Sequence, residues 1–228
     1  MPPDAALLEA RHIGRRHADG HRWLLEDVSL EVRPGERLAV VGASGSGKTL
    51  LLRALALLDP LHRGEVLWRG QPVRRDEIPA FRRQAVYLHQ RPALPEDTVE
   101  AALRRPFSLR CHRQRRQFDR DRIVRQLGQL GRDESFLAKK VADLSGGESQ
   151  ITALLRAIQL DPALLLLDEP TAALDSRTSR AAEQLLVGWI DESPHRRAFV
   201  WVSHDAAQAE RFVQRSLCVE GGRVVISG

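Results

Sequence analysis

A glycine-rich segment early in the chain has the residue types and the spacing needed to hold a phosphate group. Residues 42–49 read Gly-Ala-Ser-Gly-Ser-Gly-Lys-Thr and match the pattern G-x-x-x-x-G-K-S/T in full. Glycines let a backbone wrap a phosphate with its N–H groups turned inward, and a following helix adds the positive end of its dipole. Lys48 is expected to reach the β- and γ-phosphates of a nucleotide, and Thr49 to ligate Mg²⁺. An ordinary glycine turn between a strand and a helix is the alternative. The candidate binding residues are Gly42, Ala43, Ser44, Gly45, Ser46, Gly47, Lys48 and Thr49.

Two carboxylates follow an apolar run later in the chain. Residues 164–167 are four leucines, and Asp168 and Glu169 come directly after them. At the end of a buried strand, Asp168 can hold Mg²⁺ through the water shell of the metal, and Glu169 can polarise a water molecule for attack on the γ-phosphorus. Many buried strands end in aspartate, so the pair indicates this chemistry only in combination with the glycine-rich segment.

The segment 144–148, Leu-Ser-Gly-Gly-Glu, has two interpretations. Ser145 and Glu148 have the spacing of a capping box, which predicts the start of a helix, and such a start also attracts anions. Two glycines in the first turn, Gly146 and Gly147, destabilise a helix, which makes sense if a phosphate must approach the backbone closely. A structural cap and a phosphate contact therefore both remain open, and the position 20 residues before Asp168 favours the phosphate contact.

Composition limits what else the chain can be. Its 228 residues are 43% hydrophobic and 29% charged, as in a globular domain. The net charge of +5 fits nucleic acid, acidic lipid headgroups or a solvated surface, but aromatic residues, at 5%, are scarce for a protein that stacks bases. Cys111 and Cys218 lie far apart, so neither a disulfide framework nor a cysteine zinc site is expected, and a reducing cytoplasm is the natural compartment. No apolar run reaches the ~20 residues that span a bilayer, and the start of the chain is not expected to be a signal peptide.

The elements that must position these residues alternate between strands and helices. Strands are expected at 7–13, 24–32, 37–41, 85–89, 164–168, 198–203, 216–219 and 223–226, with a hairpin at 65–73. Helices are expected at 49–58, 148–160, 177–190 and 206–212. This order predicts an α/β fold with a mostly parallel sheet covered on both faces and an N-terminal antiparallel β region. We interpret 1–228 as one domain, with a core at 1–90 and 145–228 and an inserted α-helical subdomain at 91–144.

Together these motifs resemble those of an ATP-binding cassette (ABC) ATPase, the nucleotide-binding subunit of an ABC transporter. The resemblance covers almost the whole chain in the right order, from the glycine-rich segment through 144–148 and the carboxylate pair to Ser-His-Asp at 203–205. It implies a P-loop NTPase fold with a RecA-like core, and an ATPase that uses ATP and Mg²⁺. A P-loop kinase would not explain residues 144–148.

The resemblance also implies roles for residues that spacing alone leaves undecided. Gln90, 42 residues after Lys48, is similar to the glutamine that contacts Mg²⁺ and water and senses the membrane partner. His204, 35 residues after Glu169, is similar to the histidine that contacts the γ-phosphate. Asp175 is similar to the aspartate of a loop that crosses the dimer interface.

Two positions depart from the pattern of the family. Where an aromatic residue usually stacks on adenine, alignment places His17, with Trp23 as a competing candidate. After Glu148 the family commonly shows a basic residue, glutamine and arginine, whereas this chain has Ser-Gln-Ile at 149–151. Because of this departure, the sequence does not decide which ionic contacts the predicted helix makes.

Partners are implied as well. Two copies of the chain are expected to sandwich two ATP molecules, with Ser145 and Gly147 of one subunit closing on ATP held by Lys48 of the other. This homodimer is expected to drive a separate transmembrane permease subunit, which would hold it at the inner, cytoplasmic face of the cell membrane. Residues 84–99 resemble those of small iron-export ABC ATPases (Fet type), which makes iron export one candidate for the transport.

Residues 90–110 are expected to form the surface on which the permease docks. Its apolar floor would comprise Leu94, Val99, Leu103 and Phe107, with the arginines of 104–116 at the rim, unless these apolar residues only pack the helical subdomain. The rival function is a soluble ABC ATPase that acts on nucleic acid in DNA repair or translation. Such proteins usually carry long coiled coils or a second cassette, for which 228 residues leave no room, so no nucleic-acid partner is expected.

Overall fold

The computed structural model describes residues 5–95, 97–109 and 117–225, so Cys111 and the arginines at 110–116 lie outside the described residues. The chain forms two compact units. The first comprises the residues up to 87, 163–169 and those from 190 onward, and the second comprises 88–162 and 170–189. The division into a core and a subdomain at 91–144 stays a prediction.

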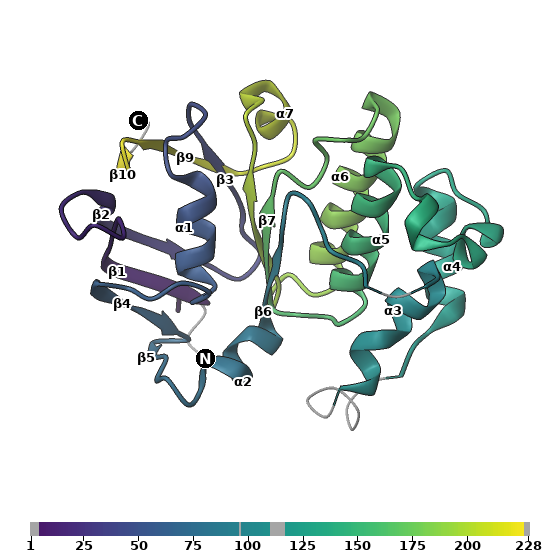
Figure 1. The fold of residues 1–228 in the computed structure, drawn as a ribbon, viewed down its shortest axis with the longest axis horizontal. Helices are drawn as coiled ribbons and strands as arrows, with labels where there is room; N and C mark the ends of the chain where they lie inside the picture. The colour runs from purple at the N-terminus through teal and green to yellow at the C-terminus, as the bar shows by residue number, and fades with distance from the viewer. Residues whose placement is uncertain (1–4, 96, 110–116, 226–228) are drawn as a thin grey trace. The chain divides into compact units, whose positions relative to one another are not determined.

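The first unit contains a four-stranded antiparallel sheet (Figure 1). Its order is β2-β1-β4-β5, from β1 (Leu8–Arg16), β2 (Trp23–Val32), β4 (Arg63–Trp68) and β5 (Gln71–Pro72). Leu8, Ala10 and Ile13 are buried, as expected of a strand with one face on the core. The expected N-terminal antiparallel region and the hairpin around residue 70 are therefore present.

The second sheet of this unit has six strands in the order β10-β9-β3-β8-β7-β6. They are β3 (Arg37–Val41), β6 (Ala85–Leu88), β7 (Leu164–Asp168), β8 (Ala198–Val202), β9 (Arg215–Glu220) and β10 (Arg223–Val225). The pairs β9–β3, β3–β8 and β8–β7 are parallel, and only the β10–β9 pair is antiparallel among the pairs whose register is described. All residues of β7 and β8 are buried, which accounts for their continuous apolar runs. The predicted mostly parallel sheet is confirmed.

Helix α1 (Lys48–Leu55) joins the two sheets into one core, because it packs against β2 on one side and against β7 and β8 on the other. It ends three residues before the expected 58, since Leu57 takes a left-handed conformation with φ of 52°. Helix α2 (Ile78–Gln84) was not expected from the sequence. Its buried Phe81 packs edge-on against Trp68, with the ring centroids 5.3 Å apart.

The second unit is helical. It contains α3 (Val99–Ser108), α4 (Arg120–Gln129), two 3₁₀ helices, η1 (Glu134–Ala138) and η2 (Val141–Asp143), α5 (Gly146–Ile158) and most of α6 (Ser176–Asp191). The side chains of Thr98, Asp119 and Ser145 cap α3, α4 and α5. Val99 and Leu103 are completely buried, so they pack the interior of this unit, and the expectation that they form an exposed groove floor is wrong.

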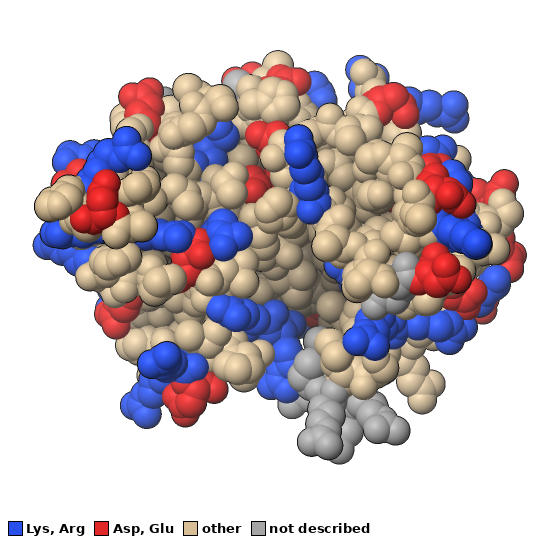
Figure 2. All heavy atoms as spheres, viewed as in Figure 1, with Lys and Arg blue, Asp and Glu red and all other residues tan. Residues whose placement is uncertain are grey.

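In the described part of the chain, no helix combines the length and the apolar character needed to cross a membrane. Among the described residues on the face drawn in Figure 2, acidic and basic side chains lie interspersed. The short helix α7 (Ala206–Glu210) follows β8 in the first unit.

Two glycines of the β4–β5 region give a matched test of how tightly β4 packs on β1. Gly64 and Gly70 both have positive φ, 74° and 79°. A Cβ at Gly64 would lie 2.3 Å from the carbonyl oxygen of Arg11, whereas a Cβ at Gly70 would have nothing within 4 Å. We expect Gly70→Ala to lower the free energy of unfolding by about 1 kcal/mol, the cost of a left-handed residue. Gly64→Ala should cost at least about 1 kcal/mol more, because backbone must move. Urea unfolding of both variants measures this, and equal losses would contradict the packing.

Candidate nucleotide-binding and hydrolysis site

Three neighbouring strand ends of the first unit bring the predicted chemistry to one edge of the sheet. In the parallel register, Val202 of β8 lies opposite Val40 of β3 and opposite Asp168 of β7. The carboxyl ends of these strands therefore lie side by side, which is where open α/β sheets bind ligands. The glycine-rich segment follows β3, Glu169 follows β7, and Ser203 and His204 follow β8.

The glycine-rich segment forms a tight loop that only glycine can build at its first position. Gly42 has φ of 146°, and a Cβ there would lie 2.3 Å from the carbonyl oxygen of Val219. The far side of the loop is fixed by Gly222, whose N–H donates to the carbonyl of Ser46 at 2.9 Å. The hydroxyl oxygen of Ser46 is buried and has no hydrogen-bond partner among the described residues, so the loop holds an unused polar group.

Lys48 lies over this loop. Its ammonium donates to the carbonyl oxygens of Gly42 at 2.7 Å and Ala43 at 2.8 Å, and the residue is only 7% exposed. An ammonium has three donors, so these two bonds hold the charge at the loop and leave a third donor for an anion.

Behind the loop, Asp168 is buried at 2% exposure and is held by two hydroxyl groups. Thr49 Oγ1 donates to Asp168 Oδ1 and Tyr87 OH donates to Asp168 Oδ2, both at 3.0 Å. Burial raises the pKa of Tyr87 far above its ordinary value, and the charge of Asp168 raises it further. Tyr87 therefore remains a protonated donor to the carboxylate at physiological pH.

A chain of charged groups continues from Tyr87 away from the loop. Arg53, in α1, interacts with the Tyr87 hydroxyl and donates two hydrogen bonds to Asp59, at 2.7 and 2.8 Å. Arg15 donates to the same carboxylate. The hydrogen bonds from Arg53 and Arg15 hold the pKa of Asp59 below its ordinary value. This network braces α1 and β6 around the buried carboxylate.

Glu169 and His204 approach each other in front of the strand ends. Glu169 Oε2 lies 3.5 Å from His204 Nδ1, and the Glu169 N–H donates to the carbonyl of Val202. Glu169 has φ of 47°, an uncommon conformation for a residue with a side chain and one that often marks functional sites. The Glu169 side chain is 20% exposed and that of His204 67% exposed, so both can reach a ligand at this edge.

In the second unit, the segment 144–148 forms the predicted capping box at the start of α5. The Glu148 N–H donates to Ser145 Oγ at 3.2 Å, and the Ser145 N–H donates to Glu148 Oε2 at 3.0 Å. Lys139 adds an ion pair, with Nζ 2.7 Å from Glu148 Oε1. The Lys139 ammonium, followed by the Ser145 hydrogen bond, holds the pKa of Glu148 below its ordinary value. Lys139 thus supplies an ionic contact where the residues after Glu148 do not.

The two glycines of this segment have different surroundings. A Cβ at Gly147 would lie 2.7 Å from the carbonyl oxygen of Ala173, so glycine is required there by the loop 171–175. A Cβ at Gly146 would make only an ordinary 3.5 Å contact with Ala173 Cβ. Tight packing within this unit therefore explains Gly147 without a ligand. For Gly146, close approach of a phosphate stays a prediction.

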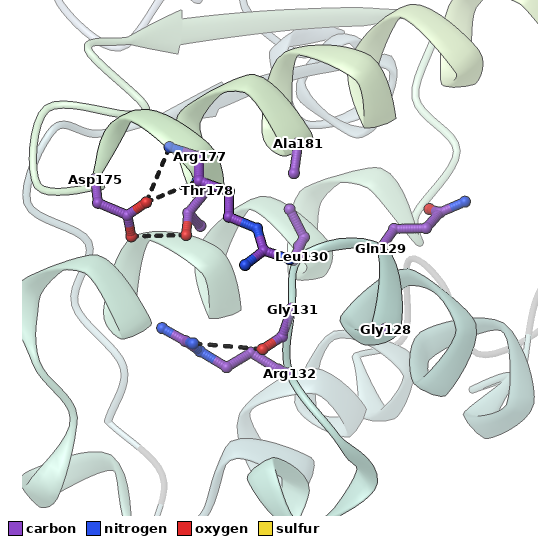
Figure 3. Close-up of a pocket in the computed structure, with 9 residues that line it drawn as sticks. All are labelled: Gly128, Gln129, Leu130, Gly131, Arg132, Asp175, Arg177, Thr178 and Ala181. Carbon is purple, nitrogen blue, oxygen red and sulfur yellow. Dashed lines mark hydrogen bonds between the residues drawn. The ribbon is translucent and has the colours of Figure 1, made fainter.

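Asp175 caps helix α6, as Figure 3 shows. Its carboxylate accepts hydrogen bonds from the N–H groups of Arg177 at 3.0 Å and Thr178 at 2.9 Å, and from the Thr178 hydroxyl at 2.8 Å. The Thr178 bonds hold the pKa of Asp175 below its ordinary value. A pocket of about 310 Å³ lies beside this cap, lined by the turn after α4 and the first turns of α6. The expected nucleotide contact of Asp175 stays a prediction.

Gln90 lies exposed in the loop that follows β6, and its carbonyl accepts a hydrogen bond from the Gln150 side chain at 3.2 Å. The adenine candidates lie near the β1–β2 turn. His17 is exposed and pairs with Asp19 at 2.9 Å. Trp23 is engaged within the sheet, because the Arg16 guanidinium lies over its ring at 4.5 Å. The ring edge of Trp23 also packs where a Cβ on Gly14 would be only 2.9 Å away.

Sequence reasoning missed three residues of these sites. Tyr87 is the single tyrosine of the chain, and it stands at the end of an apolar strand three residues before Gln90. Lys139 is one of only three lysines in the chain, and its position shortly before the capping box could have indicated an ion pair there. Gln150 stands where the family pattern also has glutamine, but a polar residue in a helix does not reveal its hydrogen-bond partners.

Comparison with known proteins decides the family. Residues 25–172, more than half of the chain, match the family described as "ABC transporter". The chain belongs to the ABC transporter family. It is 36% identical to the "Probable anion import ATP-binding protein" of Haloferax volcanii, over 97% of this chain and 80% of that protein. It is also 36% identical to the "Lipoprotein-releasing system ATP-binding protein LolD" of Pseudomonas syringae pv. tomato, over 97% of this chain and 98% of that protein. Identity to the "Probable iron export ATP-binding protein FetA" of Escherichia coli is 33%, over 90% of this chain and 88% of that protein.

A solved structure gives the same result. The "Dimeric structure of a post-hydrolysis state of the ATP-binding cassette MJ0796 bound to ADP and Pi" is 28% identical, with a TM-score of 0.83 over 95% of this chain and 96% of that chain. The predicted P-loop NTPase fold is therefore confirmed. This ABC protein is the ATP-binding, ATP-hydrolysing subunit of a transporter. A P-loop kinase is excluded, and transport is favoured over action on nucleic acid.

The capping box of this ABC protein predicts a pH-dependent contribution to stability. Glu148→Gln removes the ion pair with Lys139, and we expect it to lower the free energy of unfolding by about 1 kcal/mol at pH 7. The folded-state pKa of Glu148 lies below its ordinary 4.5, so its stabilisation is complete above that pH and is lost as the pH falls through the lowered pKa. The difference between the two proteins should therefore stay constant from pH 7 to about 5 and shrink below about 4.5. Urea unfolding across this range measures it.

The control for this experiment is Glu210→Gln. Glu210 is exposed, and the described residues give it no ion pair. We expect its removal to change stability little at any pH. A Glu148→Gln difference that grows as the pH falls would contradict the assigned role of the carboxylate.

Proposed function

We propose that this ABC ATPase binds MgATP on the loop 42–49 and hydrolyses it as a homodimer that drives a transmembrane permease. The observation that carries the proposal is the hydrogen bond from Thr49 to the buried carboxylate of Asp168, directly behind a loop shaped for phosphate. In the dimer, Ser145, Gly146 and Gly147 of one subunit close on ATP held by Lys48 of the other. The similar solved cassette, which is dimeric and bound to ADP and Pi, supports this arrangement.

The residues present fit Mg²⁺. The cation prefers oxygen ligands and keeps several of its waters, and the Thr49 hydroxyl and the Asp168 carboxylate offer such oxygens 3.0 Å apart. The described part of the chain has no group of three or more His, Cys, Asp or Glu side chains that could hold a metal, so waters and nucleotide oxygens would complete the ligand set. Thr49, Asp168 and Gln90 would hold the ion. When bound, it neutralises charge that develops on the β- and γ-phosphates.

The remaining side chains divide the work of hydrolysis. The ammonium of Lys48 holds the phosphates together with the N–H groups of the loop. Glu169 accepts a proton from the water that attacks the γ-phosphorus. His204, 3.5 Å from Glu169, orients that water and the γ-phosphate, together with Gln90. Asp175 meets the second subunit, and His17 is the proposed adenine contact because Trp23 is already packed against Arg16.

Glu169→Gln tests the assignment of the base. The variant should bind ATP normally, turn over roughly 100- to 10,000-fold more slowly, and accumulate as an ATP-bound dimer, because the amide cannot accept the proton. Steady-state phosphate release and size-exclusion chromatography with ATP measure these outcomes. Glu65→Gln, at an exposed position of β4, is the control and should behave as the parent. Near-normal turnover of Glu169→Gln would remove the residue from the role of base.

The docking surface for the permease is proposed at residues 90–110. Position supports this, since a helix pressing on the segment would move Gln90. Pro95 and Asp97 are exposed there, while the backbone of Asp97 is held by a hydrogen bond from the N–H of Val141 to its carbonyl at 2.9 Å. Of the apolar residues expected in the groove, Leu94 and Phe107 remain partly exposed. The surface therefore presents exposed side chains on a loop whose backbone is held by a hydrogen bond at Asp97.

Introducing positive charge on this surface should separate docking from folding. Asp97→Arg and Pro95→Arg are expected to keep the fold and the ATPase rate of the isolated subunit while losing co-purification with membranes of the source cells. Asp121→Arg, an equally exposed change in α4, is the control and should co-purify as the parent does. Normal co-purification of both docking variants would place the permease elsewhere.

Attachment to the cytoplasmic face of the membrane follows from this docking and is part of the same proposal. The iron-export cargo stays a prediction. A relative named for iron export is 33% identical, and relatives named for anion import and lipoprotein release are each 36% identical, so sequence similarity ranks no cargo first. A deletion strain with unchanged intracellular iron would count against iron.

A further inference from the structure

One buried side chain in the second unit connects three segments that are far apart in the sequence. Gln150 lies in the second turn of α5 and is 4% exposed. Its Nε2 donates to the carbonyl of Gln90 at 3.2 Å, and its Oε1 accepts from the N–H of Ala173 at 2.9 Å. Both ends of the amide are thus bonded to main chain, one in the loop after β6 and one in the loop before α6.

Residues at both ends of α5 contact the same two segments. Three residues before Gln150, Gly147 brings the helix so close to the loop 171–175 that a Cβ would lie 2.7 Å from the Ala173 carbonyl. In the last turn of α5, Arg156 donates to the carbonyl of Ala93 at 3.4 Å, and the C-cap residue Gln159 donates to that of Leu103 at 2.7 Å. The helix therefore holds segment 90–103 by its carbonyls.

These bonds fix loop positions and not merely side-chain positions. Because Gln150 is buried, moving either loop away would leave a donor or an acceptor of its own amide unsatisfied, which costs more than the bond itself contributes. The loop 171–175 is fixed at its other end as well, because Asp175 caps α6 (Figure 3). A displacement of Gln90 must consequently strain either the Gln150 amide or the loop at Ala173.

We propose that Gln150 is a positioning residue that couples the permease-docking segment at Gln90 to the loop 171–175. A movement of either loop is passed to the other through the one amide, and the start of α5 moves with them. This inference rests on the proposed function, because it takes Gln90 as the beginning of the docking segment. The competing explanation is that Gln150 only satisfies buried polar groups.

Hydrogen exchange of the full chain, with and without the β,γ-imido analogue of ATP and Mg²⁺, separates the two explanations. In the parent, the analogue should slow exchange in peptides covering 42–49, 88–98 and 170–178. In Gln150→Leu, which loses both bonds, slowing at 42–49 should persist while the change at 88–98 falls at least about fivefold, since 1 kcal/mol is roughly a factor of five. Gln150→Glu keeps the acceptor for Ala173 and loses only the donor to Gln90. It should therefore lose the response at 88–98 and retain that at 170–178.

Gln126→Leu is the matched control. Gln126 is a similarly buried amide of the same unit, 8% exposed and carried by α4. It should leave all three responses as in the parent even if its stability changes. Parent-like responses at 88–98 in folded Gln150→Leu and Gln150→Glu would overturn the proposal, and so would a parent that shows slowing at 42–49 but none at 88–98. A parent without slowing at 42–49 would overturn the proposed nucleotide binding itself, so the two failures are distinguishable.

Discussion

The parallel pairing of β3, β8 and β7 is the constraint on which the catalytic edge depends. Its backbone register places Val40, Val202 and Asp168 in one row, so the residues that follow each strand emerge together. Strand periodicity makes this placement strict, because a slip of one residue would turn every side chain to the other face. The glycine-rich loop, Glu169 and His204 meet because three strands end at the same level.

A buried carboxylate in this apolar sheet has to be supported by hydrogen-bond donors. Asp168 is 2% exposed and lies at the end of a strand of leucines, where an unpaired charge would be very costly. The hydroxyls of Thr49 and Tyr87 satisfy its two oxygens, and Arg53 connects Tyr87 to the ion pair with Asp59. In a low-dielectric interior such contacts strengthen one another. The same network that offsets the cost of burying the Asp168 carboxylate also fixes its orientation toward the phosphate loop.

The second unit relies on helix ends and side-chain bonds to main chain. Its helices begin at polar caps, and α5 begins at a capping box reinforced by Lys139. Polar side chains of α5 and of its C-cap then donate to main-chain carbonyls, as Gln150 does to Gln90 in a loop and Gln159 does to Leu103 in α3. Bonds of this kind do not require particular side chains in the loops. The loops can therefore be held firmly while their exposed side chains, such as those of Pro95 and Asp97, serve another surface.

Local sequence determined much of this protein. The phosphate loop, the carboxylates after β7 and the capping box at Ser145 each depend on residues adjacent in the chain, whose backbone preferences and spacing act locally. The strand and helix order was also readable, because buried strands and amphipathic helices leave distinct patterns. Helix α2 and the early end of α1 at Leu55 were not readable, since a few residues and one left-handed Leu57 carry little periodicity.

Contacts between distant segments were decided only by the tertiary structure. Tyr87 and Asp168 are 81 residues apart, and Gln90 and Gln150 are 60 apart. Burial at Val99 and Leu103 likewise depended on which helices pack on α3, although an apolar stripe alone fits both a groove and a core. The requirement for Gly147 comes from the carbonyl of Ala173 and not from its own neighbours. Sequence spacing records which groups are available, but only the packed chain brings a given donor within hydrogen-bonding distance of a given acceptor.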